Sequence, residues 1–265
     1  MSDTTVERGV ERASVVVVGD RFTEFLALRG TIAASDLLAR LRTGDIPREL
    51  AVSVGQGLSA DQLSELSVLA AMNRGSVFIR QGEVPAHVEQ RLTHKHDAKN
   101  VLIGPVEETG DGGYRAALLL DQRVEVLADH LTGLHIPAVT LLEAARQTWT
   151  VVTEQFLLDD GPPTRFVISS IASAFHRFVF PLPATLEYRL RGRERTPVGQ
   201  SIAFTVSVRQ GGETAAEFTV EIRVIPQRFA EKQEVMAART AVRQGLAAAE
   251  AVAAEPVLAG AAAGR

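Results

Sequence analysis

The residues best suited to chemistry gather in the stretch 129–156, where two histidines precede a long amphipathic segment that carries a carboxylate near its start. His130 and His135 lie shortly before Pro137, and imidazole titrates near neutral pH, so either histidine can serve as a general acid or base. We expect His130 to act, with His135 as a competitor that the sequence alone does not separate from it. Glu143 is either a general base or the carboxylate that orients a histidine. Its alternative is a solvated position on a polar helix face.

A helix that begins at Pro137 must position Glu143. Proline suits a first helical turn, because its missing N–H would have no partner there and its φ is already helical. Apolar residues then recur at spacings of three and four, which predicts a buried stripe. The stripe consists of Val139, Leu142, Ala145, Trp149, Val152 and Phe156, and a separate polar face carries Glu143, Gln147, Thr150 and Glu154. The glycine and prolines in 159–163 should end this helix near Leu158.

Several groups around the helix are candidates for binding a substrate. The N–H groups of Ala138 and Val139 at the helix start could form an oxyanion hole with help from the helix dipole. Gln147 shares a face with Glu143 and is a further substrate-binding candidate. Arg146 and Lys95 are candidates for contacting a phosphate or a carrier protein, although an arginine on a helix is more often part of a surface ion pair.

Two further motifs favour structural interpretations over metal or cofactor binding. His94 and His96 flank Lys95, but a His-x-His pair without a third ligand is a weak metal signal, so we assign no metal. The segment Gly55-Gln56-Gly57 follows a predicted strand, yet it lacks the third glycine of a dinucleotide fingerprint and the Lys-Ser/Thr of a P-loop. We interpret it as a strand-to-helix turn and predict no cofactor.

The composition indicates a globular protein that does not bind nucleic acid. The chain has 265 residues, of which 46% are hydrophobic, and this is ample for a core. A net charge of −4 and an aromatic content of 5% give neither a basic surface nor a base-stacking surface. Cysteine is absent, which fits a reducing cytoplasm, and we see neither a signal peptide nor a membrane-spanning run. We therefore expect a soluble cytoplasmic protein with no membrane partner.

The first third of the chain alternates strand and helix patterns. Residues 1–12 are polar and expected to be flexible. Predicted strands at 13–18, 50–54 and 76–80 alternate with helices at 35–42, capped by Ser35, and from Ser59 to about Met72. This rhythm predicts a small α/β unit with parallel strands over residues 13–82, an accessory or docking module.

The rest of the chain reads as one helix and an antiparallel sheet, so the expected fold class is α+β. Runs at 100–103 and 114–120 flank the glycine-rich turn 109–113, which predicts a hairpin. Four further strands are expected at 165–173, 184–193, 201–209 and 215–225. We place this domain at residues 92–228. A surface helix should follow from Phe229, and the Ala/Gly-rich tail 248–265 is expected to be disordered, so that 229–265 form a separate segment.

A hairpin, a long central helix and a wrapping antiparallel sheet resemble the hotdog fold. The run His94-Lys95, the residues Asp129-His130 and His135-Ile136-Pro137, and above all the string LLEAARQ at 141–147 are similar to the A-factor biosynthesis (AfsA-type) hotdog family. More distantly, the spacing from the proline to the glutamate resembles β-hydroxyacyl carrier-protein dehydratases. The resemblance covers residues 92–226. Ala138 stands where that family has glycine, and one residue is added before Pro137.

The resemblance implies an acyltransferase that uses β-ketoacyl thioesters of an acyl carrier protein or coenzyme A. The acceptor would be the hydroxyl of dihydroxyacetone phosphate or a similar phosphorylated molecule, and the product a precursor of a γ-butyrolactone signal in secondary metabolism. Because a single hotdog normally completes its site against a second copy, the resemblance also implies a homodimer. The alternatives are a dehydratase or thioesterase on the same scaffold, and a non-catalytic acyl-binding or scaffold protein.

Overall fold

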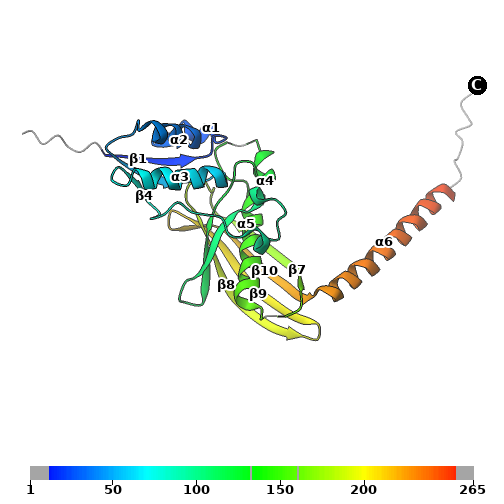
Figure 1. The fold of residues 1–265 in the computed structure, drawn as a ribbon. Helices are drawn as coiled ribbons and strands as arrows, with labels where there is room; N and C mark the ends of the chain where they lie inside the picture. The colour runs from blue at the N-terminus through cyan, green and yellow to red at the C-terminus, as the bar shows by residue number, and fades with distance from the viewer. Residues whose placement is uncertain (1–11, 132, 160, 255–265) are drawn as a thin grey trace, which may run out of the picture.

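The described part of the chain forms two sheets (Figure 1). Each sheet contributes to a buried apolar cluster of its own. The computed structural model describes residues 12–131, 133–159 and 161–254. The expectations for residues 1–11 and 255–265 lie outside the described residues. Helices and strands are mixed, as the sequence predicts for an α+β chain, whereas the division into domains at residues 82 and 92 stays a prediction.

The first sheet is small and fully parallel. Its strands lie in the order β2-β1-β3-β4 and alternate with helices along the chain. The elements are β1 (Arg12–Val18), α1 (Thr23–Leu26), β2 (Thr31–Ala33), α2 (Ala34–Thr43), β3 (Glu49–Val54), α3 (Ala60–Met72) and β4 (Val77–Ile79). Alternate residues of β3 are buried against α2 and α3, which is the period-two pattern of a strand that faces a core on one side.

The helix predicted to open at Ser59 does begin there, whereas the cap predicted at Ser35 is wrong. Ser59 caps α3, since its hydroxyl accepts from the Gln62 N–H while the Gln62 side chain accepts from the Ser59 N–H. Ser35 is not the cap of α2, because this helix begins one residue earlier and Ser35 lies in its first turn. Both the N–H and the hydroxyl of Ser35 donate to the Asp20 carboxylate instead.

Two short elements of this unit escaped the sequence analysis. Helix α1 has a single turn, and β2 has three residues, so neither is long enough to show a periodic pattern. Strand β2 pairs in parallel with β1 and extends the sheet on that side.

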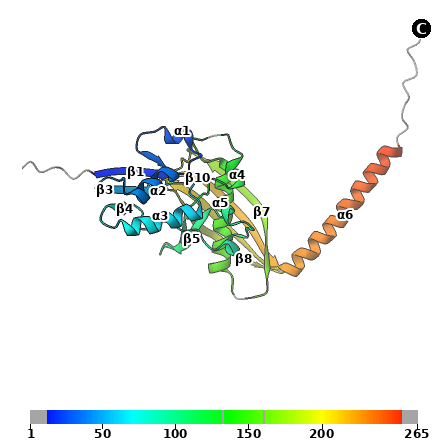
Figure 2. The ribbon, with the colours of Figure 1, turned by 45° about the horizontal axis from the view of Figure 1, so that its top comes forward.

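The second sheet is antiparallel and curves around α5 (Ala138–Val152), with the strand order β5-β6-β8-β9-β10-β7 (Figures 1 and 2). Its strands are β5 (Ile103–Glu108), β6 (Gly113–Leu118), β7 (Thr164–Phe175), β8 (Thr185–Thr196), β9 (Gly199–Gln210) and β10 (Glu213–Pro226). The hairpin prediction is correct in kind, but its first strand begins at Ile103, because residues 98–100 form a 3-10 turn. The sheet wrapped around a long helix is the hotdog layout.

Helix α5 buries a different stripe from the one that its spacing predicts. Ala145, Trp149 and Val152 are buried as expected, but Val139 is 58% exposed and Phe156 is 37% exposed. The buried side also includes Leu141, Ala144 and Val151, so the core-facing stripe is rotated about the helix axis. The helix ends at Val152 and continues as one π-helical turn over Thr153–Leu157, close to the predicted end.

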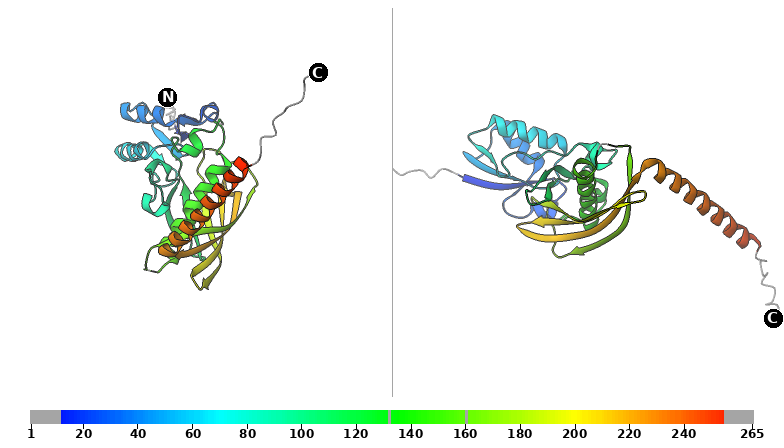
Figure 3. Two further views of the ribbon diagram at one scale, coloured as in Figure 1. Left: turned by 90° about the vertical axis from the view of Figure 1, so that its right-hand side faces the viewer. Right: turned by 90° about the horizontal axis from the view of Figure 1, so that it is seen from below.

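Strand β7 forms one edge of the second sheet, and α6 (Gln227–Ala254) leaves the body beside it. Within the described chain β7 pairs on one side with β10, and its apolar residues Val167, Ile168, Ile171 and Phe175 are between 39% and 48% exposed. Helix α6 begins where the Gln227 N–H donates to the Pro163 carbonyl and then extends away from both sheets (Figure 3). Residues 248–254, expected to be disordered, belong to this helix.

The two units are joined through Gly55-Gln56-Gly57, the glycine-containing segment that was considered as a phosphate loop. The Gln56 side chain donates to the Leu118 carbonyl and accepts from the Leu120 N–H, and the Gly57 N–H also donates to the Leu120 carbonyl. A Cβ at Gly57 would overlap Gly19, so this crossing requires glycine. The backbone and side chain of this segment are committed to the junction, in agreement with the turn interpretation.

Candidate functional site

Four of the predicted residues lie together where α5 faces β7 and the segment 90–102. Lys95 Nζ lies 2.6 Å from Glu143 Oε1, and Arg146 Nε lies 2.8 Å from Glu143 Oε2. Arg146 Nη2 and Gln147 Nε2 each donate to Glu143 Oε1 at 3.0 Å. One carboxylate is therefore held by two cations and an amide, and we call Glu143, Lys95, Arg146 and Gln147 the carboxylate cluster.

The segment 90–102 places Lys95 beside Glu143 because hydrogen bonds attach this segment to the polar side of α5. Gln147 is fully buried; its amide donates to the Asn100 carbonyl at 2.7 Å and accepts from the Leu102 N–H at 2.8 Å. Arg146 Nη2 also donates to the Thr93 carbonyl at 2.8 Å. The predicted polar face of the helix is thus covered by chain rather than by solvent. The sequence shows amphipathic spacing, but it does not show that a distant segment caps the polar side.

His94 belongs to this fastened segment and lies against Glu154 and Phe166. It is the only non-glycine residue in the described part of the chain with a positive φ, at 54°. Its ring Nε2 lies 2.5 Å from Glu154 Oε1, and its ring contacts Phe166 of β7. Nowhere in residues 12–131, 133–159 and 161–254 do three or more histidine or carboxylate side chains gather as a metal site would require.

Glu143 is a stabilised anion. Burial acts to raise the pKa of its carboxyl group, but hydrogen bonds and charge from Arg146, with further hydrogen bonds from Gln147 and Lys95, outweigh burial and lower the pKa. A carboxylate with a lowered pKa and several donors is a weak proton acceptor. Its geometry suits the task of orienting Lys95 and Arg146.

An apolar hollow opens beside the carboxylate cluster. Its volume is about 340 Å³, and Lys95, Glu143 and Arg146 form its polar rim. The apolar lining comes from α4 (Glu125–Ala128), α5 and the β7 edge, and it consists of Val126, Val139, Leu142, Trp149, Ile168 and Ile171. The exposed Val139 and the half-buried Leu142 thus face a cavity at the edge of the molecule.

The two histidines lie in the loop that leads into the N-terminal end of the same helix. Their ring centroids are 6.3 Å apart, and the His135 ring is 5.0 Å from that of Phe178. His135 is half-buried and lines a second hollow of about 330 Å³ together with Ala138, Leu141 and Phe175, whereas His130 is exposed. This second hollow adjoins the start of α5, where the first N–H groups of a helix have no intrahelical acceptor. Ala138 and Val139 occupy these first helical positions.

Some residues that contact the histidine loop were not singled out from the sequence. Arg21, in the loop after β1, donates from Nη2 to the His130 carbonyl at 3.0 Å. The ring of Phe178 packs between those of His135 and Phe180. An arginine far upstream and an aromatic residue after a strand carry no motif, so only the folded arrangement identifies them.

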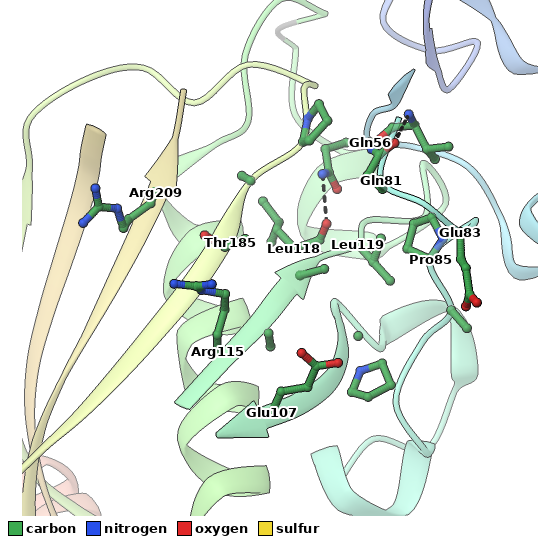
Figure 4. Close-up of a pocket in the computed structure, with 18 of the residues that line it drawn as sticks. Gln56, Gln81, Glu83, Pro85, Glu107, Arg115, Leu118, Leu119, Thr185 and Arg209 are labelled. Carbon is green, nitrogen blue, oxygen red and sulfur yellow. Dashed lines mark hydrogen bonds between the residues drawn. The ribbon is translucent and has the colours of Figure 1, made fainter. Parts of the chain in front are cut away.

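Another hollow lies away from α5, between the parallel sheet and the outer face of the second sheet (Figure 4). It has a volume of about 740 Å³. Several of its polar side chains are paired with one another or with the backbone. Gln81 bonds both backbone groups of Val54, and Glu187 accepts from Arg115 at 3.1 Å and lies 3.7 Å from Arg209. This hollow is the seam between the two units, and the groups named for chemistry lie elsewhere.

A family model of known proteins agrees with the hotdog layout. The family model described as the A-factor biosynthesis hotdog domain matches residues 79–226, and its match begins earlier than the expected residue 92. Among curated proteins, none shows significant sequence similarity to the chain.

Similar solved structures include several thioesterases. A thioesterase from Haemophilus influenzae shares 15% identity and a TM-score of 0.38 over 52% of this chain and 91% of its own. A mutant thioesterase from Pseudomonas aeruginosa shares 14% identity and a TM-score of 0.36 over 63% of this chain and 94% of its own. A conserved protein from Pseudomonas aeruginosa gives 13% identity and a TM-score of 0.37 over 52% of this chain and all of its own.

The antiparallel sheet that wraps around α5 defines a hotdog protein. Since the family match covers more than half of the sequence, the chain belongs to the A-factor biosynthesis hotdog family.

Proposed function

We propose that this protein is a homodimeric acyltransferase that takes β-ketoacyl groups from carrier-protein or coenzyme A thioesters. The acceptor is a phosphorylated alcohol like dihydroxyacetone phosphate, and the product leads to a γ-butyrolactone-type signal. The observation that carries the proposal is the pairing of a cation-rich carboxylate cluster with an apolar hollow on the open face of α5. This pairing meets the needs of an amphipathic acyl donor and an anionic acceptor.

The apolar hollows accommodate the acyl chain, and the polar rim accommodates the phosphate. Lys95 and Arg146 are both cations and pair with the single carboxylate of Glu143, so the carboxylate cluster keeps a net positive charge at the rim of the hollow. Arginine and lysine both bind phosphate oxygens through charge-assisted hydrogen bonds. Glu143 and Gln147 keep these donors oriented, which reduces the cost of ordering them when a ligand binds.

The transfer step needs a base, and His135 is the candidate that the geometry supports best, with His130 beside it. The imidazole removes the proton of the acceptor hydroxyl while this oxygen attacks the thioester carbonyl carbon. The carbonyl oxygen becomes negative and accepts hydrogen bonds from the N–H groups at Ala138 and Val139. The C–S bond then breaks, the imidazolium returns its proton to the thiolate, and an ester and a free thiol leave.

A second copy of the chain would complete the site. Among the described residues β7 has a strand neighbour only on its β10 side; Ile168 and Ile171 are exposed at this sheet edge and also line the hollow beside Glu143. A long apolar edge strand is a template for pairing with another chain. Pairing of β7 with the same strand of a second copy would cover this edge and close the hollow.

Substitution of the histidines tests the proposal directly. His135→Ala should lower turnover of a β-ketoacyl thioester by about 100-fold or more, because it removes the base, which is worth about 10²–10⁴-fold. His130→Ala should have a smaller effect, and His96→Ala, which changes an exposed histidine outside the hollows, should leave turnover unchanged. Full activity in both His135→Ala and His130→Ala would remove the proposed base.

A further inference from the structure

We propose that the N-terminal α/β unit acts as a buttress that positions the histidine loop, and that Arg21 is its principal positioning residue. The inference rests on the proposed function, because it assigns the loop 129–137 a role in turnover. It gives a specific role to the unit that the sequence predicts as an accessory or docking module.

Three separate contacts connect the segment 20–26 to the histidine loop. Arg21 Nη2 donates to the His130 carbonyl at 3.0 Å. The Glu24 carboxylate lies directly against Gly133, where an added Cβ would overlap it. Phe25 stacks on Phe180 with ring centroids 6.3 Å apart, and Phe180 packs on Phe178, which contacts His135. The contacts reach the beginning, middle and end of the loop.

The segment that makes these contacts is itself rigidly held. The Asp20 carboxylate accepts from the N–H and hydroxyl of Ser35, which ties the segment to α2. The Arg21 N–H donates to Gln122 Oε1 at 3.0 Å, and the Gln122 N–H donates to the Gly57 carbonyl at 3.2 Å. A segment fixed at several points can transmit its position to a loop that contacts it.

Two phenylalanines of the N-terminal unit, Phe22 and Phe25, pack inside the unit built on the second sheet. Phe22 is fully buried and Phe25 is 5% exposed, and both belong to the apolar cluster of the second sheet rather than to that of the parallel sheet. Arg21 Nη1 is buried without a hydrogen-bond partner among the described residues. An unpaired buried guanidinium nitrogen costs free energy, and such costs concentrate where a side chain serves function. For Arg21 we take this function to be the hydrogen bond that Nη2 donates to the His130 carbonyl of the loop.

The first test compares Arg21→Ala and Arg21→Lys with Arg29→Ala, a matched control in which an exposed arginine near α1 is removed. Arg21→Ala should lower kcat for thioester turnover by about 10- to 100-fold, since displacement of a catalytic group by about 1 Å can cost about 10²-fold. KM should stay nearly unchanged, because the hollows are intact. Arg21→Lys should restore part of kcat, and Arg29→Ala should match the wild type. Unchanged kcat in a folded Arg21→Ala variant would overturn the inference.

The second test uses the contact between Glu24 and Gly133. Gly133→Ala should displace the loop and lower kcat, while Glu24→Ala in the same chain removes the overlapping carboxylate and should restore it. A loss of kcat in Gly133→Ala that Glu24→Ala fails to repair would contradict the buttress contact. This reciprocal pair also separates a positional effect from a general loss of folding.

The histidine side-chain NMR signals provide a measurement that does not depend on turnover. His130 and His135 signals, assigned by His→Ala substitution, should shift in Arg21→Ala and remain in place in Arg29→Ala. If the wild-type protein fails to turn over any thioester, the proposed function fails, yet this measurement still decides the buttress. Identical histidine signals in Arg21→Ala and the wild type would overturn it.

Discussion

At the scale of single residues, the Glu143 carboxylate on α5 binds two cations, Lys95 and Arg146, and the side-chain amide of Gln147. Sequence spacing predicts that the residue is presented on a polar face, and the string LLEAARQ indicates its family. The contact with Lys95, however, depends on a segment 48 residues upstream that folds back on α5. A local pattern contains no information about such a contact, so the sequence identified the members of the cluster but not their mutual pairing.

Glu143→Gln should destabilise the protein and reduce turnover. The amide cannot neutralise Lys95 and Arg146, so two like charges remain at a half-buried site. We expect the free energy of unfolding to fall by about 1–3 kcal/mol, the range for losing a partner of a hydrogen-bonded charge. Chemical denaturation measures this change, with Glu125→Gln at an exposed ion pair as the control. Equal stability of Glu143→Gln and the wild type would show that the cluster contributes nothing to folding.

The lowered pKa of Glu143 also predicts a dependence of stability on pH. A carboxylate whose pKa in the folded state lies below its ordinary value of 4.5 stabilises the fold above pH 4.5, and this contribution is lost as the pH falls through the folded-state pKa. Wild-type stability should therefore fall more steeply below pH 4.5 than that of Glu143→Gln. Thermal melts across this pH range test the difference, and parallel curves for the two proteins would contradict it.

Tyr188 offers a test of a buried group outside the candidate site. Its ring is fully buried and stacks on Phe204, its hydroxyl has no hydrogen-bond partner in the described chain, and burial raises its pKa. Tyr188→Phe should leave the unfolding free energy unchanged or raise it by about 1 kcal/mol, because an unpaired polar group is removed from the core. A loss of stability in denaturant titrations would mean that the hydroxyl has a partner in solution.

At the scale of elements, the long periodic segments were predicted well and the short or covered ones were not. Strands β9 and β10 alternate over their length, and α3 has its capping box, so local rules sufficed for them. Helices α1 and α4 and strand β2 are too short to carry a period. The stripe of α5 was misplaced because segment 90–102 buries Gln147 and Thr150, while the open β7 side exposes Val139. Tertiary contacts, absent from any local window, decided those positions.

The attachment of segment 90–102 to α5 should depend on Gln147. Gln147→Leu keeps a similar volume but leaves the Leu102 N–H and the Asn100 carbonyl without their partner. The expected loss is about 2–3 kcal/mol of unfolding free energy, because buried backbone groups lose their hydrogen bonds. Gln155→Leu, at an exposed position after the helix, serves as the control. If both variants unfold at the same denaturant concentration, Gln147 does not hold the segment.

At the scale of the whole molecule, the site spans more of the chain than its family match. The match covers residues 79–226, whereas Arg21 and Glu24, which contact the histidine loop, precede that range in the sequence. None of the helices in the described residues has the length and apolar character to cross a membrane. The sequence predicted both units but not how they join, because Gln56 and Phe22 find their partners in the other unit.

The proposed dimer gives a prediction at the same scale. The wild type should sediment at twice the chain mass of 28.5 kDa, and Ile168→Lys with Ile171→Lys should sediment as a monomer, because charges at the β7 edge oppose pairing. Val242→Lys, at an exposed apolar position of α6, controls for the added charge and should remain dimeric. A wild-type monomer at micromolar concentration would contradict the dimer.

Acyl transfer itself is tested most directly by incubating the purified protein with a β-ketoacyl thioester, with and without dihydroxyacetone phosphate. Thiol release and product mass are followed together. We predict that release requires the acceptor and that an ester of acyl group and acceptor forms in equal amount. Thiol release that is independent of the acceptor, with a free acid as product, would contradict acyl transfer and identify a thioesterase. Binding of the thioester without any release would leave the protein as an acyl-binding module.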